Sequence, residues 1–336
     1  MNYPKVSIIT LNWNGLEDTT ECLESLKKIT YPNYEVTVVD NGSEGNDAQV
    51  LEERFGDYIH LIKNDRNYGF YGGANIGMRY ALNNSNPDYL LLLDNDTVVD
   101  PEFLTEMVKV AEPDPVIGIA GAKIYYYDKP DRLQYLGEKI DLWGCIVNPL
   151  STTAKRIFGR EEFDRGQHDS IKEIEHMGFW CALIRREGLE SIGLFYGRPF
   201  HEYVYYAEID YFIRVREAGF KIVYIPKAKV WHKYRTENRL DGSHQYGALR
   251  SRFRLMRQHA TRWQYRYFLI YFFGVYFWLA TAYYLIWLRR PRMLLGFYKG
   301  IRDGLFHSGL EKPLKEYSEE GYDSKGSYVS EKSSGN

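Results

Sequence analysis

Cysteine is scarce in this chain of 336 residues, which contains only Cys22, Cys145 and Cys181. Three cysteines spaced this widely are too few for the disulfide framework of a small secreted protein, and they lack the spacing of a zinc cluster. The sequence therefore predicts a protein of a reducing compartment.

A strong net charge is also lacking, because 43 Lys and Arg residues face 45 Asp and Glu residues, which leaves −2. Whole-molecule charge thus predicts no polyanionic partner, and we expect no nucleic-acid binding. A secretory leader is a further expected absence, because Met1 is followed by only four residues before a strand-like run begins.

The first hundred residues contain apolar runs that alternate with amphipathic stretches. Strand patterns cover residues 6–11, 34–39, 59–62 and 89–93, and helical patterns cover residues 16–28, 48–55 and 74–83. Strands that alternate with helices predict an α/β fold, with a mostly parallel sheet covered by helices on both faces.

Two carboxylates, Asp94 and Asp96, flank Asn95 directly after the apolar run at residues 89–93. Ligands of open α/β folds bind at the carboxyl ends of the strands. Since Mg²⁺ and Mn²⁺ prefer oxygen ligands, the pattern predicts a cation that clamps a diphosphate there. The alternative is a polar turn after a core strand, because this short pattern is common by chance.

Other predicted strands also end in polar turns. Asp40 could accept the imide N–H of a uracil or thymine base, or it could form an Asx-turn with local backbone. The glycine-rich segment 67–75 opens a helix, so its backbone N–H groups could approach phosphate or sugar oxygens. Its glycine spacing is not that of a dinucleotide site, and a plain mobile loop is the alternative.

The second half begins with an irregular, Tyr-rich stretch at residues 125–166, which we assign to acceptor recognition. A small-residue turn then runs into a strand at residues 177–184. A helix that Gly219 ends carries acids in its first turn, where the helix dipole alone would favour them. Pro226 is expected to break the next strand, and His232 follows; a histidine there is often structural.

Taken in order, these features resemble the inverting family 2 glycosyltransferases with the GT-A fold, and within them the rhamnosyltransferase-like branch. The resemblance covers roughly residues 4 to 310. The features that carry it are Asp40, Asn67-x-Gly69-Phe70-x-x-Gly73-x-Asn75-x-Gly77, Asp94-Asn95-Asp96, the turn from Gly178 to Ala182, the acids Glu208 and Asp210, Arg214, Gly219, Pro226 and His232.

The resemblance implies three sets of site residues. The nucleotide-sugar set is Thr10, Asn12, Asp40, Asn67, Gly69, Gly73, Asn75, Asp94 and Asn95, with Asp40 on the base. The metal set, for Mg²⁺ or Mn²⁺, is Asp94, Asp96 and His232. The acceptor set is Gly178, Trp180 and Cys181.

The chain departs from the family pattern at the catalytic helix, where the usual pair of acids aligns with Ala207 and Glu208. We assign Glu208 as the general base that deprotonates the acceptor hydroxyl, with Asp210 as the second candidate. Glu is one methylene longer than the usual Asp, so its extra reach must be compensated.

Residues 267–288 carry no charge, are rich in aromatics and are flanked by arginines. At ~1.5 Å per residue, 22 residues could cross a ~30 Å hydrocarbon core, or they could lie in the interface. A buried helix of a soluble protein is the alternative. From Lys233 to Arg302 there are 14 Lys or Arg and two acids, which suits anionic headgroups.

We therefore expect a GT-A catalytic domain at residues 1–235 (nucleotide-sugar half about 1–122, acceptor half about 123–235), a helical membrane-associated region at 236–310 and a disordered tail at 311–336. The expected activity is metal-assisted, inverting sugar transfer from a UDP- or dTDP-sugar to a lipid-linked glycan or surface polysaccharide, on the cytoplasmic face of the cell membrane. The alternatives are a non-catalytic membrane scaffold, suggested by Ala207, and a sugar-phosphate nucleotidyltransferase, which would need a phosphate loop that residues 10–15 do not provide.

Overall fold

The computed structural model describes residues 3–135, 140, 142, 162–195, 206–233 and 242–306. Most of the expected acceptor loop and the expected disordered tail lie outside the described residues.

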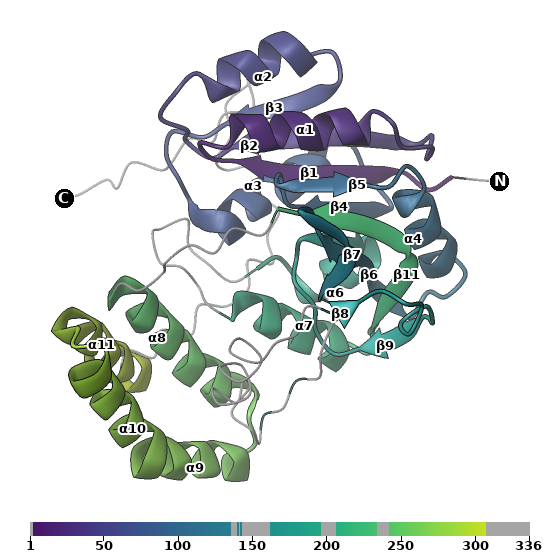
Figure 1. Ribbon diagram of the computed structural model, residues 1–336. Helices are drawn as coiled ribbons and strands as arrows, with labels where there is room; N and C mark the ends of the chain where they lie inside the picture. The colour runs from purple at the N-terminus through teal and green to yellow at the C-terminus, as the bar shows by residue number, and fades with distance from the viewer. Residues whose placement is uncertain are drawn as a thin grey trace, which may run out of the picture.

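One sheet organises the described chain, with the strand order β3-β2-β1-β4-β10-β6-β11-β5 (Figure 1). Its strands are β1 (Val6–Asn12), β2 (Tyr34–Asp40), β3 (Ile59–Lys63), β4 (Tyr89–Leu93), β5 (Thr97–Val99), β6 (Ile117–Tyr126), β10 (Cys181–Arg185) and β11 (Lys221–His232). Three strands extend it: β7 (Lys129–Tyr135), β8 (Glu162–Phe163) and β9 (Lys172–Ile174). The first four strands are parallel, but β10 runs antiparallel between β4 and β6, so the sheet is mixed.

Helices cover both faces of this sheet, as expected. On one face lie α1 (Leu16–Leu26), α2 (Asp47–Phe55) and α4 (Phe103–Ala111); on the other lie α3 (Gly69–Asn84), α6 (Arg186–Ile192) and α7 (Ala207–Glu217). Alternate strand residues feed the two cores: Ile8 packs in the first and Ile9 in the second. The predicted α/β architecture is therefore confirmed.

A third apolar cluster belongs to the C-terminal helices, which form a group beside α7 in Figure 1. These are α8 (Gly242–His259), α9 (Arg262–Tyr271), η1 (Phe272–Tyr276), α10 (Phe277–Ala282), η2 (Tyr283–Trp287) and α11 (Pro291–Phe306), where η marks a π-helical stretch. Ile209 and Ile213 of α7 join this cluster, so α7 contacts both the sheet and α8.

The glycine-rich segment opens a helix as expected, because α3 begins at Gly69 and includes Gly73, and the alternative of a mobile loop does not hold. Two other local expectations were wrong. The stretch after Tyr125 is partly a hairpin of β6 with β7. Pro226 does not end its strand: β11 shifts register against β6 between Ile225 and Lys229 and then pairs again as far as His232. A bulge absorbs the missing N–H of proline.

Gly77 tests the packing of α3 on the sheet. A Cβ there would lie 2.5 Å from Cγ2 of Ile9 and 3.0 Å from Cγ2 of Val39. Ala normally stabilises a helix by about 1 kcal/mol over Gly, but overpacking of a core costs roughly 1–3 kcal/mol. We expect Gly77→Ala to lower the free energy of unfolding by about 1 kcal/mol or more in urea denaturation. Gly45→Ala, at an exposed glycine with only the Asp47 carboxylate nearby, is the neutral control; equal midpoints for both variants would contradict this packing.

Candidate active site

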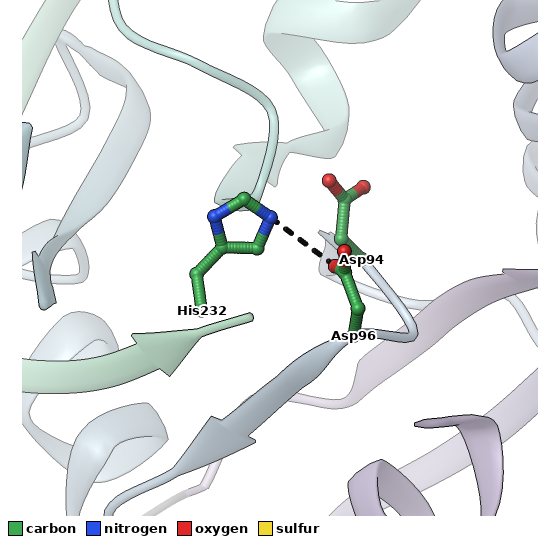
Figure 2. Close-up of side chains that lie close together, drawn as sticks. All are labelled: Asp94, Asp96 and His232. Carbon is green, nitrogen blue, oxygen red and sulfur yellow. Dashed lines mark ion pairs between the residues drawn. The ribbon is translucent and has the colours of Figure 1, made fainter. Parts of the chain in front are cut away.

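Pairing between β5 and β11 brings together residues that are far apart in sequence. His232 is the register partner of Thr97, and the backbone N–H of Lys233 donates to the carbonyl of Asp96 at 2.9 Å. His232 Nε2 therefore lies 3.2 Å from Asp96 Oδ1. Figure 2 shows Asp94 beside this pair, and one ligand atom from each of the three residues lies within 4.8 Å of the others.

The electrostatics of this group favour a cation. Burial, followed by the negative charge of Asp96, raises the pKa of Asp94 to about 8. Burial alone would lower the pKa of His232, but the hydrogen bond and charge of Asp96 outweigh it and raise the pKa. Two carboxylates crowded in a half-buried site are costly without a positive charge, which a divalent ion would supply.

The imidazole of His232 is oriented for such an ion. Its Nδ1 lies 2.9 Å from Oε1 of Gln134 on β7, so an Nδ1–H donated to that oxygen leaves the Nε2 lone pair facing the aspartates. The two carboxylates suit Mn²⁺ or Mg²⁺, and a neutral imidazole is a common ligand of divalent metal ions. The residues present thus fit the predicted metal ion. Gln134 was missed from the sequence because its partner lies on another strand.

Three of the predicted nucleotide-sugar residues share one hydrogen-bond network at the carboxyl ends of the strands. Asn12 Nδ2 donates to Asp40 Oδ1 at 2.8 Å, and Asn12 Oδ1 accepts from the hydroxyl of Thr19 at 2.8 Å. Thr19 in turn accepts from Asn95 Nδ2 at 2.8 Å. The network connects the proposed base-binding carboxylate to the segment that carries Asp94 and Asp96. Asp40 also accepts from the hydroxyl of Ser43 at 2.6 Å, in a local turn.

The residues of the glycine-rich segment have different structural roles. Asn41 holds its start, because its Nδ2 donates to Asn67 Oδ1 and to the carbonyl of Gly69, both at 3.1 Å. Gly73 allows close packing, since a Cβ there would lie 2.5 Å from Cδ2 of Leu11. Asn75 is buried, and its amide bonds both the N–H and the carbonyl of Phe195 at 3.1 Å.

Asn75 therefore positions Phe195 in this structure, and its assignment to the nucleotide stays a prediction without support from its contacts. The same holds for Thr10, which is completely buried and whose hydroxyl has no hydrogen-bond partner among the described residues.

Glu208 lies across the site from the aspartates, in the first turn of α7. It accepts a hydrogen bond from the hydroxyl of Tyr71 on α3. Burial raises the pKa of Glu208, and the Tyr71 hydrogen bond offsets this only in part. The charge of Glu208 also contributes to the raised pKa of Asp94, so the two carboxylates share one electrostatic environment. Tyr71 lies within the predicted motif but was not singled out, because a tyrosine there carries no signal of its own.

Asp210 faces away from Glu208, because residues two apart on a helix do not share a face. It is buried, accepts from Arg214 Nε at 2.9 Å, and lies 2.8 Å from His259 Nε2 on α8. Arg214 also donates to the carbonyls of Ile192 and Leu194, at 2.8 and 3.2 Å. These contacts give Asp210 a role in positioning α7 and no access to the aspartates, so the choice of Asp210 as an alternative base has no support here.

The predicted acceptor residues divide in a similar way. Trp180 lies beside the metal-binding group: its ring centroid is 5.5 Å from that of His232, and its carbonyl accepts the N–H of Asp94 at 3.0 Å. Gly178 accommodates that ring, since a Cβ would lie 2.6 Å from Cε3 of Trp180. Cys181 is buried in the core, with its sulfur 3.9 Å from that of Met107, so its side chain does not line a surface.

The profile of Glycosyl transferase family 2 matches residues 7–193, which is more than half of the chain and includes the segment with Asp94 and Asp96. The chain belongs to this family. The rhamnosyltransferase-like branch is not confirmed by the match.

Two of the proteins similar to this family 2 chain carry names from glycan synthesis. It is 26% identical over 220 residues to the low-salt glycan biosynthesis hexosyltransferase Agl10 of Haloferax volcanii, over 65% of this chain and 63% of that protein. It is 27% identical over 253 residues to the O-antigen biosynthesis protein RfbC of Myxococcus xanthus, over 71% of this chain and 18% of RfbC. The uncharacterized protein y4gI of Sinorhizobium fredii is 30% identical over 252 residues, 68% of this chain and 24% of y4gI. The chain thus spans less than two thirds of each of these relatives.

Among solved structures, GalNAc-T7 with UDP, GalNAc and Mn²⁺ has a TM-score of 0.59 at 18% identity, over 80% of this chain and 50% of that chain. This similarity supports the fold alone.

Metal binding by this family 2 protein should depend on pH. Since the pKa of Asp94 is raised to about 8, a cation must displace a proton from it at neutral pH. We expect the affinity for Mn²⁺ to rise as pH increases from 6 and to level off above about 8, with proton release measured by calorimetry in buffers of different ionisation enthalpy. Asp94→Asn should bind more weakly and lose most of this pH dependence; affinity independent of pH in the unaltered protein would contradict the assignment.

Proposed function

We propose that this protein is an inverting, metal-assisted hexosyltransferase. It would move a sugar from a UDP- or dTDP-sugar to a hydroxyl of a lipid-linked glycan or surface polysaccharide. One observation supports this most: the charge of Glu208 contributes to the raised pKa of Asp94, which lies in a group with Asp96 and His232, and Tyr71 feels the charges of both Glu208 and Asp94. A cation site next to a carboxylate of raised pKa is what this transfer requires.

The chain's own residues are assigned to a single chemical step and to the binding of its reactants. Glu208 takes the proton of the acceptor hydroxyl while that oxygen bonds to the anomeric carbon and the bond to the diphosphate breaks, which inverts the carbon. When bound by Asp94, Asp96 and His232, a divalent cation supplies Lewis-acid stabilisation of the negative diphosphate. Asp40 binds the nucleotide base, and Asn12 and Asn95 hold the side chains of that pocket in position. Trp180 forms a wall of the site for the sugar or the acceptor.

The structure suggests how the longer Glu208 is accommodated. The hydroxyl of Tyr71 holds one carboxylate oxygen, so the other can face the acceptor. Tyr71 itself is fixed against Phe195, at 5.0 Å between ring centroids, and Phe195 is held by Asn75. We assign Tyr71 as a positioning residue for the base.

Membrane association belongs to the same proposal. The helix Arg262–Trp287 is 26 residues long and contains an 18-residue apolar window with a mean hydropathy of 1.6, of which only 17% is buried. An acceptor carried by a lipid would be presented at such a surface. We place the catalytic domain on the cytoplasmic face, in keeping with the scarcity of cysteine.

Glu208→Gln tests the base directly. Because general-base catalysis contributes about 10²–10⁴-fold, we expect kcat for sugar transfer to fall by that factor, with the stabilisation by UDP and Mn²⁺ unchanged in thermal melts. Glu187→Gln, at an exposed acid on α6, is the matched control. Turnover equal to that of the unaltered protein would remove Glu208 as the base.

Tyr71→Phe tests the positioning role. Loss of one hydrogen bond to a carboxylate should lower kcat roughly 10- to 100-fold and leave KM for the donor nearly unchanged. Since that bond lowers the pKa of Glu208, its removal should move the acidic limb of the pH–rate profile to higher pH. Tyr68→Phe, which removes a hydroxyl bound to Asp65, is the control. A drop in kcat with no movement of the acidic limb would indicate a purely structural role.

A further inference from the structure

The apolar helix Arg262–Trp287 is long enough to cross a bilayer, yet its burial is one-sided. At ~1.5 Å per residue its 26 residues extend about 39 Å. One stripe of residues is buried: Phe268, Phe272, Ala280 and Tyr284. The opposite side exposes large apolar residues, of which Ile270, Trp278, Leu279, Ile286 and Trp287 are 61–79% exposed.

The basic helix α8 contacts the buried side of the apolar helix at three points. In the second half of α8, the ring of Phe253 lies 5.0 Å from Phe268 and 4.8 Å from Phe272. Near its N-terminal end, Gln245 Oε1 accepts from the hydroxyl of Tyr284 at 2.8 Å. Between these contacts the buried guanidinium of Arg252 lies 5.4 Å from the ring of Tyr276. If the apolar helix crossed the membrane, α8 and its arginines would have to enter the hydrocarbon with it.

The following helix, α11, packs back against α8. Gly304 of α11 packs against Phe253, and Arg257 of α8 donates to the carbonyls of Gly304 and Leu305 at 2.6 and 2.9 Å. The helix α8 is itself bound to the catalytic domain through His259 and Asp210. The N-terminal end of the apolar helix is thus held next to the catalytic domain, and α11 brings the chain from the other end back to α8.

We propose that Arg262–Trp287 lies flat in one leaflet of an anionic membrane, with its exposed aromatic side in the acyl region and α8 above it, and does not span the bilayer. The proposal rests on the membrane association proposed above. Charge supports an anionic surface: residues 242–306 contain eleven Lys or Arg against one acid, Asp303. Exposed arginines flank both ends of the helix, at Arg262, Arg266, Arg289, Arg290 and Arg292. The apolar helix and α8 then lie at the level of the headgroups, and α7, which carries Glu208, lies farther from the bilayer.

Accessibility in vesicles distinguishes the two arrangements. The test uses two full-length variants, Arg262→Cys and Arg292→Cys, whose exposed positions lie at the two ends of the apolar helix. Each variant is added to preformed vesicles of phosphatidylglycerol and phosphatidylcholine. The vesicles are isolated by flotation and treated with a membrane-impermeant maleimide. A flat helix predicts that both are labelled from outside, with no gain after detergent is added. Unaltered protein gives the background from the native cysteines.

Protection of Arg292→Cys until detergent is added would overturn the flat arrangement and leave membrane association intact. Failure of the unaltered protein to float with vesicles would instead remove the membrane proposal itself. Depth gives a second readout: quenching by brominated lipids should place Trp278, identified by its loss in Trp278→Phe, in the outer part of the acyl region of one leaflet. Quenching strongest with bromines near the bilayer centre would overturn the proposal.

Discussion

Two carboxylates that the chain forces close together are the constraint on which this structure depends. Asp94 and Asp96 share a half-buried space, and burial together with the negative charge of Asp96 raises the pKa of Asp94. The fold supplies one partner, His232, by continuing β11 past Pro226 until it pairs with β5. The bulge in β11 is therefore a requirement of the site, because a strand that ended at the proline would leave both carboxylates without the imidazole.

The opposite wall of the site is held by contacts that form a closed circuit. Arg214 fixes α7 to the segment that ends at Leu194, Asn75 fixes the next residue, Phe195, to α3, and Tyr71 of α3 bonds Glu208 back on α7. These hydrogen bonds are mostly buried, and together they hold the carboxylate of Glu208, whose pKa is raised, in one position. The same α7 contacts α8 through Asp210, which joins the reaction site to the helices proposed to lie on the membrane.

Sequence patterns could predict what depends on neighbours along the chain. Apolar strands, their polar ends and the aspartates after residue 93 were found in this way, as was the α/β architecture. Contacts set by tertiary packing could not be found: Gln134 behind His232 and Tyr71 on Glu208 join residues 98 and 137 positions apart. Local patterns left a mobile loop open as an alternative at the glycine-rich segment, where the structure has the first turns of α3, and Gly73 lets that helix pack against Leu11.

The central claim is that a divalent ion binds among Asp94, Asp96 and His232 and holds the diphosphate of the donor. Crystals grown with MnCl₂ and UDP, with diffraction collected on both sides of the manganese absorption edge, test it most directly. The account predicts one anomalous peak in contact with the side chains of Asp96 and His232 and with the diphosphate oxygens, and a uracil ring beside Asp40. A manganese peak elsewhere, or UDP bound away from these residues, would contradict it.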